Sequence, residues 1–190
     1  MRSMMMTLGL AVAVTGLAFA AEESKSCGMC PVSGGPAKED VSMDYKGKKL
    51  YFCCDGCPDA VKSEPAKFAA KINHQLLVTG QIAQVGCPFS GGKVNDKTVV
   101  EFAGAKVGFC CEKCQAKFEK SSDADKLATV FAKLGKGFTM QDKCPVSGKP
   151  INAAQKTEYE GKTVYFCCGG CPDAFKADPA KFAAKLPKEE

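Results

Sequence analysis

The stretch YFCCDGCPDA at residues 51–60 returns as YFCCGGCPDA at residues 165–174, and a more divergent copy, GFCCEKCQAK, occupies residues 108–117. Successive copies are 57 residues apart, and one further cysteine precedes each copy at the same distance, which gives the spacing C-x22-C-C-x2-C. Twelve of the thirteen cysteines fall on this grid. A fixed period indicates a duplicated structural unit, so three tandem modules are expected. The grid consists of Cys30, Cys53, Cys54 and Cys57, then Cys87, Cys110, Cys111 and Cys114, then Cys144, Cys167, Cys168 and Cys171.

The spacing of these cysteines is typical of metal sites, because soft thiolate ligands can converge on one ion from two separate turns. Each repeat is also about the size at which a hydrophobic core alone gives only marginal stability. Units of this size usually gain further stability from a bound metal or from disulfides. The cysteines can provide either metal ligands or disulfides.

Local signals in the first repeat predict a tight turn followed by a β-hairpin. The turn CPVSG at residues 30–34 has a proline that fixes one φ and a glycine that allows a positive φ. Residues 41–45 and 49–53 flank the short segment KGK at residues 46–48, which is typical of a hairpin. The hairpin would bring residue 30 near residues 53–57.

A helix is predicted directly after each pair of adjacent cysteines. Pro58 fits the first helical position, and Asp59 complements the positive end of the helix dipole. Pro179 is expected to divide the corresponding stretch of the third repeat into two short helices. The segments between repeats, such as residues 78–84, are short, and we interpret them as a turn plus a strand that enters the next cysteine turn.

The N-terminal residues carry the signature of a secretory signal. Arg2 gives a positive start, an apolar run covers residues 8–20, and the run ends in a small-x-small cleavage pattern at residues 18–20. The run is short for a membrane span, so a cleaved signal over residues 1–20 is favoured over an uncleaved anchor helix. The mature protein is therefore expected to be exported, periplasmic or secreted, with no stable membrane insertion after cleavage.

The charge of the chain argues against nucleic acid as a partner. The formal net charge is +5, yet Arg2 is the only arginine. Arginine is the preferred residue for bidentate contacts to phosphate and guanine. The lysines alternate with acidic residues along the chain, which is typical of a solvated surface.

The spacing C-x22-C-x3-C, with an aromatic pair before the second cysteine and a helix after the third, resembles the TRASH/YHS-type heavy-metal-binding domain in three tandem copies. The resemblance implies an α+β fold of three small treble-clef-like β-hairpin–helix modules, linked to heavy-metal handling and notably to copper. The implied modules cover residues 25–79, 80–136 (divergent) and 137–190; we call them modules 1, 2 and 3. The metal ligands carried over by position are Cys30, Cys53 and Cys57; Cys87, Cys110 and Cys114; and Cys144, Cys167 and Cys171.

Four further cysteines are secondary candidates as ligands: Cys27, Cys54, Cys111 and Cys168. With the adjacent cysteine included, a module could offer four sulfurs, which suits tetrahedral Zn(II), whereas three sulfurs suit Cu(I). Cys27 occurs only in module 1, where it forms a second CxxC pair with Cys30, and its equivalents are Gln84 and Gln141. His74, the only histidine, is not repeated, so a surface or packing role is expected for it rather than ligation.

These observations favour an exported protein that sequesters, delivers or senses copper or zinc, with metal ions and a metal transporter or chaperone as partners. One alternative is a structural-zinc scaffold for protein interaction. Another is a disulfide-bonded or thiol-redox protein, since exported compartments permit disulfides and CxxC pairs at helix starts resemble exchange motifs. We expect no enzyme activity, because no repeated acid–base pair accompanies the cysteines.

Overall fold

The computed structural model describes residues 27–187 of the 190-residue chain. The predicted signal over residues 1–20 lies outside the described residues and stays a prediction. Within residues 27–187, no helix is both long and apolar enough to cross a membrane.

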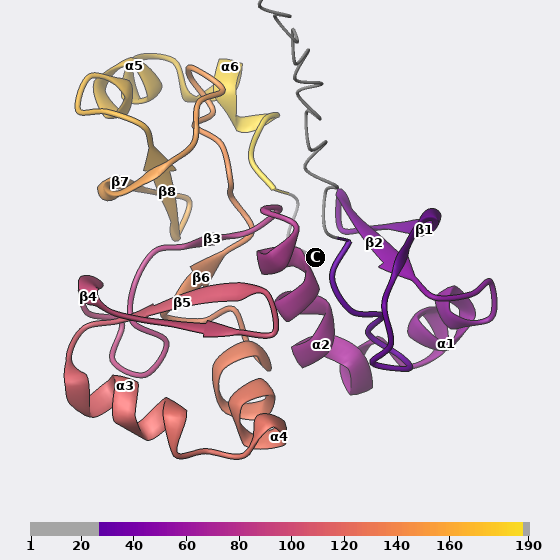
Figure 1. Ribbon diagram of the computed structural model, residues 1–190. Coiled ribbons are helices and arrows are strands. Elements are labelled where there is room, and N and C mark those ends of the chain that lie inside the picture. The colour runs from indigo at the N-terminus through magenta and orange to yellow at the C-terminus, as the bar shows by residue number, and fades with distance from the viewer. Residues whose placement is uncertain (1–26, 188–190) are drawn as a thin grey trace, which may run out of the picture.

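Each module contains one two-stranded antiparallel hairpin (Figure 1). The tip of the first hairpin has φ of 50° at Lys46 and 74° at Gly47. Positive φ at both positions is the requirement of the tight turn whose twist matches that of the strands. Each hairpin also has an irregularity in its register near the start of its first strand. The strands are β1 (Lys38–Tyr45) with β2 (Lys48–Phe52), β4 (Asn95–Phe102) with β5 (Ala105–Phe109), and β7 (Asn152–Tyr159) with β8 (Lys162–Phe166).

Helices follow the cysteines as predicted, and proline divides them in modules 1 and 3. Helix α1 (Cys57–Ser63) ends just before Pro65, which opens α2 (Pro65–Val78). Helix α5 (Cys171–Ala177) is separated in the same way from α6 (Pro179–Ala183). The predicted division at Pro179 is therefore confirmed.

Module 2 follows a different course after its cysteines, and no proline begins its second helix. Helix α3 (Glu112–Glu119) is followed by α4 (Asp123–Lys126) and a π-helical turn, η1 (Leu127–Phe131). Ser122 caps α4, since its hydroxyl accepts a hydrogen bond from the backbone N–H of Asp125.

The segments that connect the modules pair with one another. Strand β3 (Ala83–Gln84) lies at the start of module 2, and β6 (Phe138–Thr139) lies at the start of module 3. The two form an antiparallel pair, with Ala83 opposite Thr139. An ion pair of 2.8 Å between Lys48 Nζ and Asp142 Oδ1 further joins the first hairpin to the entry of module 3. The prediction of a strand at the entry to the next cysteine turn is thus confirmed for β3.

The buried residues of modules 1 and 2, together with Phe138 and Met140 at the start of module 3, form one continuous hydrophobic cluster, whereas the rest of module 3 has a smaller cluster of its own. Helix α2 joins the first two modules because it contacts β2 on one side and β5 and η1 on the other (Figure 1). Leu76 of α2 is fully buried in this contact, and Asn73 Nδ2 donates to the carbonyl of Phe131 at 2.7 Å. The first two modules therefore depend on a common core.

The structure confirms a mixed architecture of helices and small strands, with three modules that each combine a short hairpin, a helix and a cysteine cluster. The treble-clef assignment stays a prediction.

Candidate metal centres

The first cysteine of each set is placed by a tight turn that the hydrogen bonds of the backbone define. In module 1 the N–H of Cys30 donates to the carbonyl of Gly35 at 2.7 Å, and the N–H of Gly34 donates back to Cys30 at 2.9 Å. Gly34 has φ of 76°, which a residue with a Cβ rarely adopts. The same two bonds recur around Cys87 and Cys144. The turn thus buries one thiol and points it toward the end of the hairpin.

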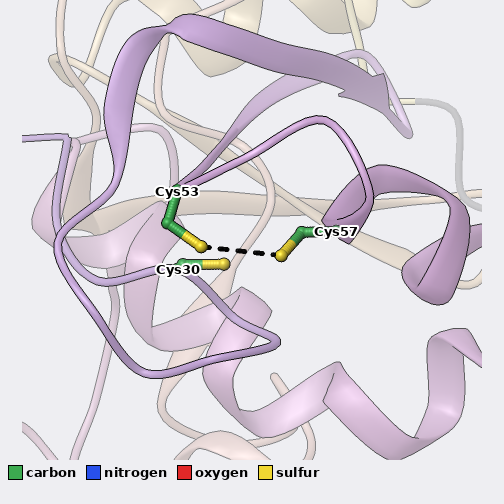
Figure 2. A group of neighbouring side chains, drawn as sticks. All are labelled: Cys30, Cys53 and Cys57. Carbon is green, nitrogen blue, oxygen red and sulfur yellow. Dashed lines mark hydrogen bonds between the residues drawn. The ribbon is translucent and has the colours of Figure 1, made fainter.

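The other two cysteines of the module 1 group come from the opposite side. Cys53 follows directly on the last residue of β2, and Cys57 is the first residue of α1. Figure 2 shows their side chains and that of Cys30 pointing toward one another. Because the hairpin returns the chain beside the first turn, residues far apart in sequence converge on one point.

The three sulfurs in each module all lie within 4.8 Å of one another. The Cys53 and Cys57 sulfurs are 3.6 Å apart, and the corresponding distances are 3.8 Å in module 2 and 3.6 Å in module 3. Sulfurs held about 2.3 Å from one ion lie roughly 3.8 to 4.0 Å apart in tetrahedral or trigonal geometry. The donor set therefore fits a single soft metal ion. The groups are Cys30, Cys53 and Cys57; Cys87, Cys110 and Cys114; and Cys144, Cys167 and Cys171.

A serine hydroxyl contacts each group, and sequence reasoning did not identify it as part of the site. Ser33 Oγ lies 3.2 Å from Cys53 Sγ, and Ser90 and Ser147 make the same contact in the other modules at 3.2 and 3.1 Å. The same hydroxyl accepts a bond from the backbone N–H two residues later, which fixes its orientation. The signal was present, because a serine follows the first cysteine by three positions in all three repeats.

The turn stabilises the thiolate form of its cysteine. Burial alone would raise the pKa of Cys30, but the backbone N–H groups of Ser33 and Cys53 and the Ser33 hydroxyl lower the pKa to about 6. Burial would also raise the pKa of Cys87 and that of Cys144, but hydrogen bonds from their own turns and from the backbone of Cys110 and Cys167 lower both values to about 6. One thiolate is therefore available in each metal-free cluster near neutral pH, which reduces the competition between protons and a metal ion.

The last cysteine of each group behaves in the opposite way. Burial, followed by the hydrogen bonds that its thiol makes to neighbouring sulfurs, raises the pKa of Cys57 far above its usual range. The same causes raise the pKa of Cys114 and that of Cys171 to about 12. In the metal-free cluster this thiol donates its proton to the sulfurs around it, and a metal ion would displace that proton.

The adjacent cysteines lie at the rim of each cluster. Cys54 is exposed, and its sulfur lies 3.5 Å from that of Cys57 and 3.8 Å from that of Cys53. Cys168 is also exposed and lies 3.5 Å from Cys171. In module 2, Cys111 is exposed, and its sulfur lies 3.7 Å from that of Cys110. None of the three belongs to the groups of sulfurs that all lie within 4.8 Å of one another.

A glutamine side chain holds the strand that leads to each cluster. Gln141 Nε2 donates to the carbonyls of Tyr165 and Lys143 at 2.6 and 3.0 Å, and its Oε1 accepts from the N–H of Tyr165 at 2.9 Å. Gln84 makes the equivalent three bonds in module 2, to Gly108 and Gly86. These bonds fix the strand next to the paired cysteines relative to the first cysteine turn.

Module 1 has Cys27 at the position of this glutamine, and Gln75 of α2 replaces the missing amide. Gln75 Nε2 donates to the carbonyls of Tyr51 and Met29 at 2.7 and 2.9 Å, and its Oε1 accepts from the N–H of Tyr51 at 2.9 Å. Cys27 is half-buried and lies outside the group formed by Cys30 and its two partners. The repeat grid did not reveal Gln75, because that residue stands at a different position in its own repeat.

His74 packs against module 2, as expected for an unrepeated histidine. Its ring is almost fully buried and meets the rings of Phe102 and Phe131 edge to face, at centroid distances of 5.4 and 5.1 Å. Its Nε2 contacts the carbonyl of Phe102 at 3.1 Å. Burial lowers the pKa of His74, so its neutral form is favoured. The ring stabilises the contact between α2 and module 2.

Comparison with known protein families supports the metal-binding interpretation for one module. Residues 143–185, which lie within module 3, match the YHS domain. No curated protein and no solved structure matches the chain. The matched residues contain the cluster of Cys144, Cys167 and Cys171. That modules 1 and 2 are further copies of this domain stays a prediction, based on the sequence repeat and the equivalent clusters.

Proposed function

We propose that the protein is an exported, non-catalytic Cu(I) carrier or store that binds one ion in each of its three modules. The observation that carries this proposal is the threefold recurrence of three sulfurs within 4.8 Å of one another. Thiolate ligands select soft ions, and three sulfurs suit Cu(I). Export, which follows from the predicted signal, is part of the proposal, as is exchange of the ion with a metal transporter or chaperone.

Burial of the sulfurs favours three ligands over four. A structural Zn(II) site is closed by four protein ligands. Here Cys30 is 1% exposed and Cys57 is 7% exposed, whereas the side chain of Cys54 is open to solvent. The continuous core of modules 1 and 2 also provides hydrophobic stability that does not depend on a metal. A carrier needs a folded metal-free form of this kind, while a structural zinc module unfolds when its metal is removed.

Structural zinc is the second candidate function, and one observation favours it. The sulfurs of Cys54 and Cys168 lie 3.5 Å from a member of the neighbouring group, so a change of side-chain rotamer would let them complete a tetrahedron. The two candidates therefore differ in whether Cys54 contributes a ligand.

The test is an anaerobic titration of the reduced full chain with Cu(I) against a chromophoric chelator that competes for the ion. We expect three equivalents for the native chain, two for Cys30→Ser, and three for the matched variant Cys54→Ser. Three equivalents with Cys30→Ser would refute the three-thiolate centre. Two equivalents with Cys54→Ser would indicate a fourth ligand and favour the zinc-type site.

A further inference from the structure

The sulfur of Cys57 takes part in two different arrangements. It belongs to the buried group with Cys30 and Cys53, and it also lies 3.5 Å from the sulfur of Cys54. Cys171 has the same double position, since it belongs to the module 3 group and lies 3.5 Å from Cys168. A disulfide at either pair would therefore remove one ligand from a metal centre.

The exposure of the two sulfurs fixes the order in which they would react. Cys54 is exposed, whereas Cys57 is only 7% exposed. In thiol–disulfide exchange an accessible thiolate attacks first, and a second thiol then resolves the mixed disulfide. Cys54 is therefore the attacking residue and Cys57 the resolving residue, and Cys168 and Cys171 have the same roles in module 3.

The neighbouring pair Cys53 and Cys54 is a poor alternative. Adjacent Cα atoms are about 3.8 Å apart across a trans peptide, which is shorter than the usual range of about 4.4 to 6.8 Å in disulfides. The peptide bonds of the described residues are all trans. The pair Cys54 and Cys57 is not restricted in this way, because two residues of the CxxC loop separate them.

We propose that modules 1 and 3 release their metal when an external disulfide converts Cys54–Cys57 and Cys168–Cys171 into internal disulfides. This inference rests on the proposed function, because it makes the stored ion available in response to the thiol–disulfide balance of the surroundings. The oxidant is a low-molecular-weight or protein disulfide.

The reaction consumes one external disulfide for each module. The Cys54 thiol loses its proton to solvent, and its thiolate attacks the external disulfide, forms a mixed disulfide and expels one thiolate. The Cys57 sulfur then uses the electron pair of its bond to the metal to attack the Cys54 sulfur. The Cys54–Cys57 bond forms, the Cys57–metal bond breaks, and the second external thiolate leaves. Two protein sulfurs are oxidised, the external disulfide is reduced to two thiols, and the ion keeps its oxidation state with two protein ligands left.

Module 2 provides an internal comparison, because its CxxC pair is placed differently relative to the following helix. The sulfur of Cys110 lies 3.7 Å from that of Cys111 and 3.8 Å from that of Cys114. Cys111 precedes α3, and Cys114 is the third residue of that helix, whereas Cys57 and Cys171 are the first residues of theirs. We therefore expect module 2 to keep its ion while modules 1 and 3 release theirs.

The test uses the full chain, reduced and loaded with three equivalents of Cu(I) without oxygen. Glutathione disulfide is added in the presence of a Cu(I) chelator that does not remove copper from the reduced loaded chain. We expect two of the three ions to move to the chelator, and peptide mass spectrometry to find the Cys54–Cys57 and Cys168–Cys171 bonds. The double variant C54S/C168S should keep all three ions, and the matched variant C111S should release two, as the native chain does.

The inference is overturned if the double variant releases copper as fast as the native chain, if the bonds found join other cysteines, or if all three modules lose their ions together. Failure of the proposed function is visible before glutathione disulfide is added, since a chain that does not bind three Cu(I) ions fails at the loading step. That result would overturn the release of metal as well.

Discussion

Ser33 shows how one side chain outside the cysteine group stabilises the thiolate form of the first cysteine. Its hydroxyl contacts the Cys53 sulfur, and together with the turn backbone it lowers the pKa of Cys30 to about 6, against the effect of burial. Ser33→Ala removes the hydroxyl, so the pKa of Cys30 should rise by roughly one to two units, because hydrogen bonds to charged groups contribute about 1.5–3 kcal/mol and one unit corresponds to about 1.4 kcal/mol.

The measurement is the ultraviolet absorbance of thiolate in the reduced, metal-free chain as a function of pH. Part of the step near pH 6 should move to a higher pH in Ser33→Ala, while the contributions of Cys87 and Cys144, whose pKa values are also about 6, stay in place. Ser63→Ala is the control, since the Ser63 hydroxyl donates to a carbonyl of α1 and does not contact the cluster. An unchanged step in Ser33→Ala would contradict this role of the serine.

Gln75 is a second residue outside the cysteine clusters, and its side-chain amide is expected to contribute strongly to stability. Gln75→Leu leaves the backbone groups of Tyr51 and the carbonyl of Met29 without their partner. An unsatisfied buried polar group costs about 1–3 kcal/mol, so the free energy of unfolding should fall by about 2–3 kcal/mol in urea denaturation. Gln81→Leu is the matched control; its amide binds Lys49 at an exposed position, where water can replace it, and a loss below about 1 kcal/mol is expected. Equal losses in the two variants would refute the structural role of Gln75.

The cysteine grid predicted which residues converge, because ligands must be repeated if sites are repeated. The structure places those nine sulfurs in three groups, yet Gln75 was not predictable in this way. It supplies from α2 what Gln84 and Gln141 supply from the entry strands. In module 1 the amide therefore comes from a different place in the sequence, through a tertiary contact that the sequence period alone does not reveal.

The hairpins and the helix starts were predictable at the scale of elements because their signals are local. The sequence KGK gives a tight turn with positive φ at Lys46 and Gly47, and proline begins a new helix at residues 65 and 179. The π-helical turn η1 had no such signal. It forms where module 2 packs against α2, so it depends on a contact between modules.

Gly47→Ala tests the hairpin turn. Gly47 has φ of 74° and no neighbouring atom within 4 Å of an added Cβ, so the cost of the substitution is conformational alone. A residue with a Cβ in this region costs roughly 1–2 kcal/mol, and the free energy of unfolding should fall by that amount. Gly56→Ala is the control, because Gly56 also has open space but a φ of −77°. A similar loss of stability in both variants would show that the turn does not need a positive φ at residue 47.

The distribution of the buried residues determines which modules of the molecule are stabilised together. The sequence repeat suggests three equivalent units, but the buried residues divide into a cluster shared by modules 1 and 2, which also takes in the start of module 3, and a separate cluster in the rest of module 3. The length of α2 causes the difference. This helix has 14 residues and contacts module 2 from within module 1, whereas the corresponding α6 has five residues.

Leu76→Ala should therefore destabilise two modules at once. Removal of a buried leucine side chain costs about 2–5 kcal/mol, and Leu76 lies in the shared cluster. Hydrogen exchange should show faster exchange in both β2 and β5, with no change in β8. Val164→Ala is the reciprocal variant, because Val164 is buried in module 3 and should affect β8 alone. Faster exchange confined to β2 in Leu76→Ala would contradict a common core.

The proposed function requires that each repeat is a separate three-thiolate centre for one metal ion. Native mass spectrometry of the full chain, purified under reducing and anaerobic conditions and loaded with Cu(I), counts the ions directly. We expect three ions for each chain, and two after Cys171→Ser. A metal-free chain with six internal disulfides, or the loss of all three ions in Cys171→Ser, would contradict it.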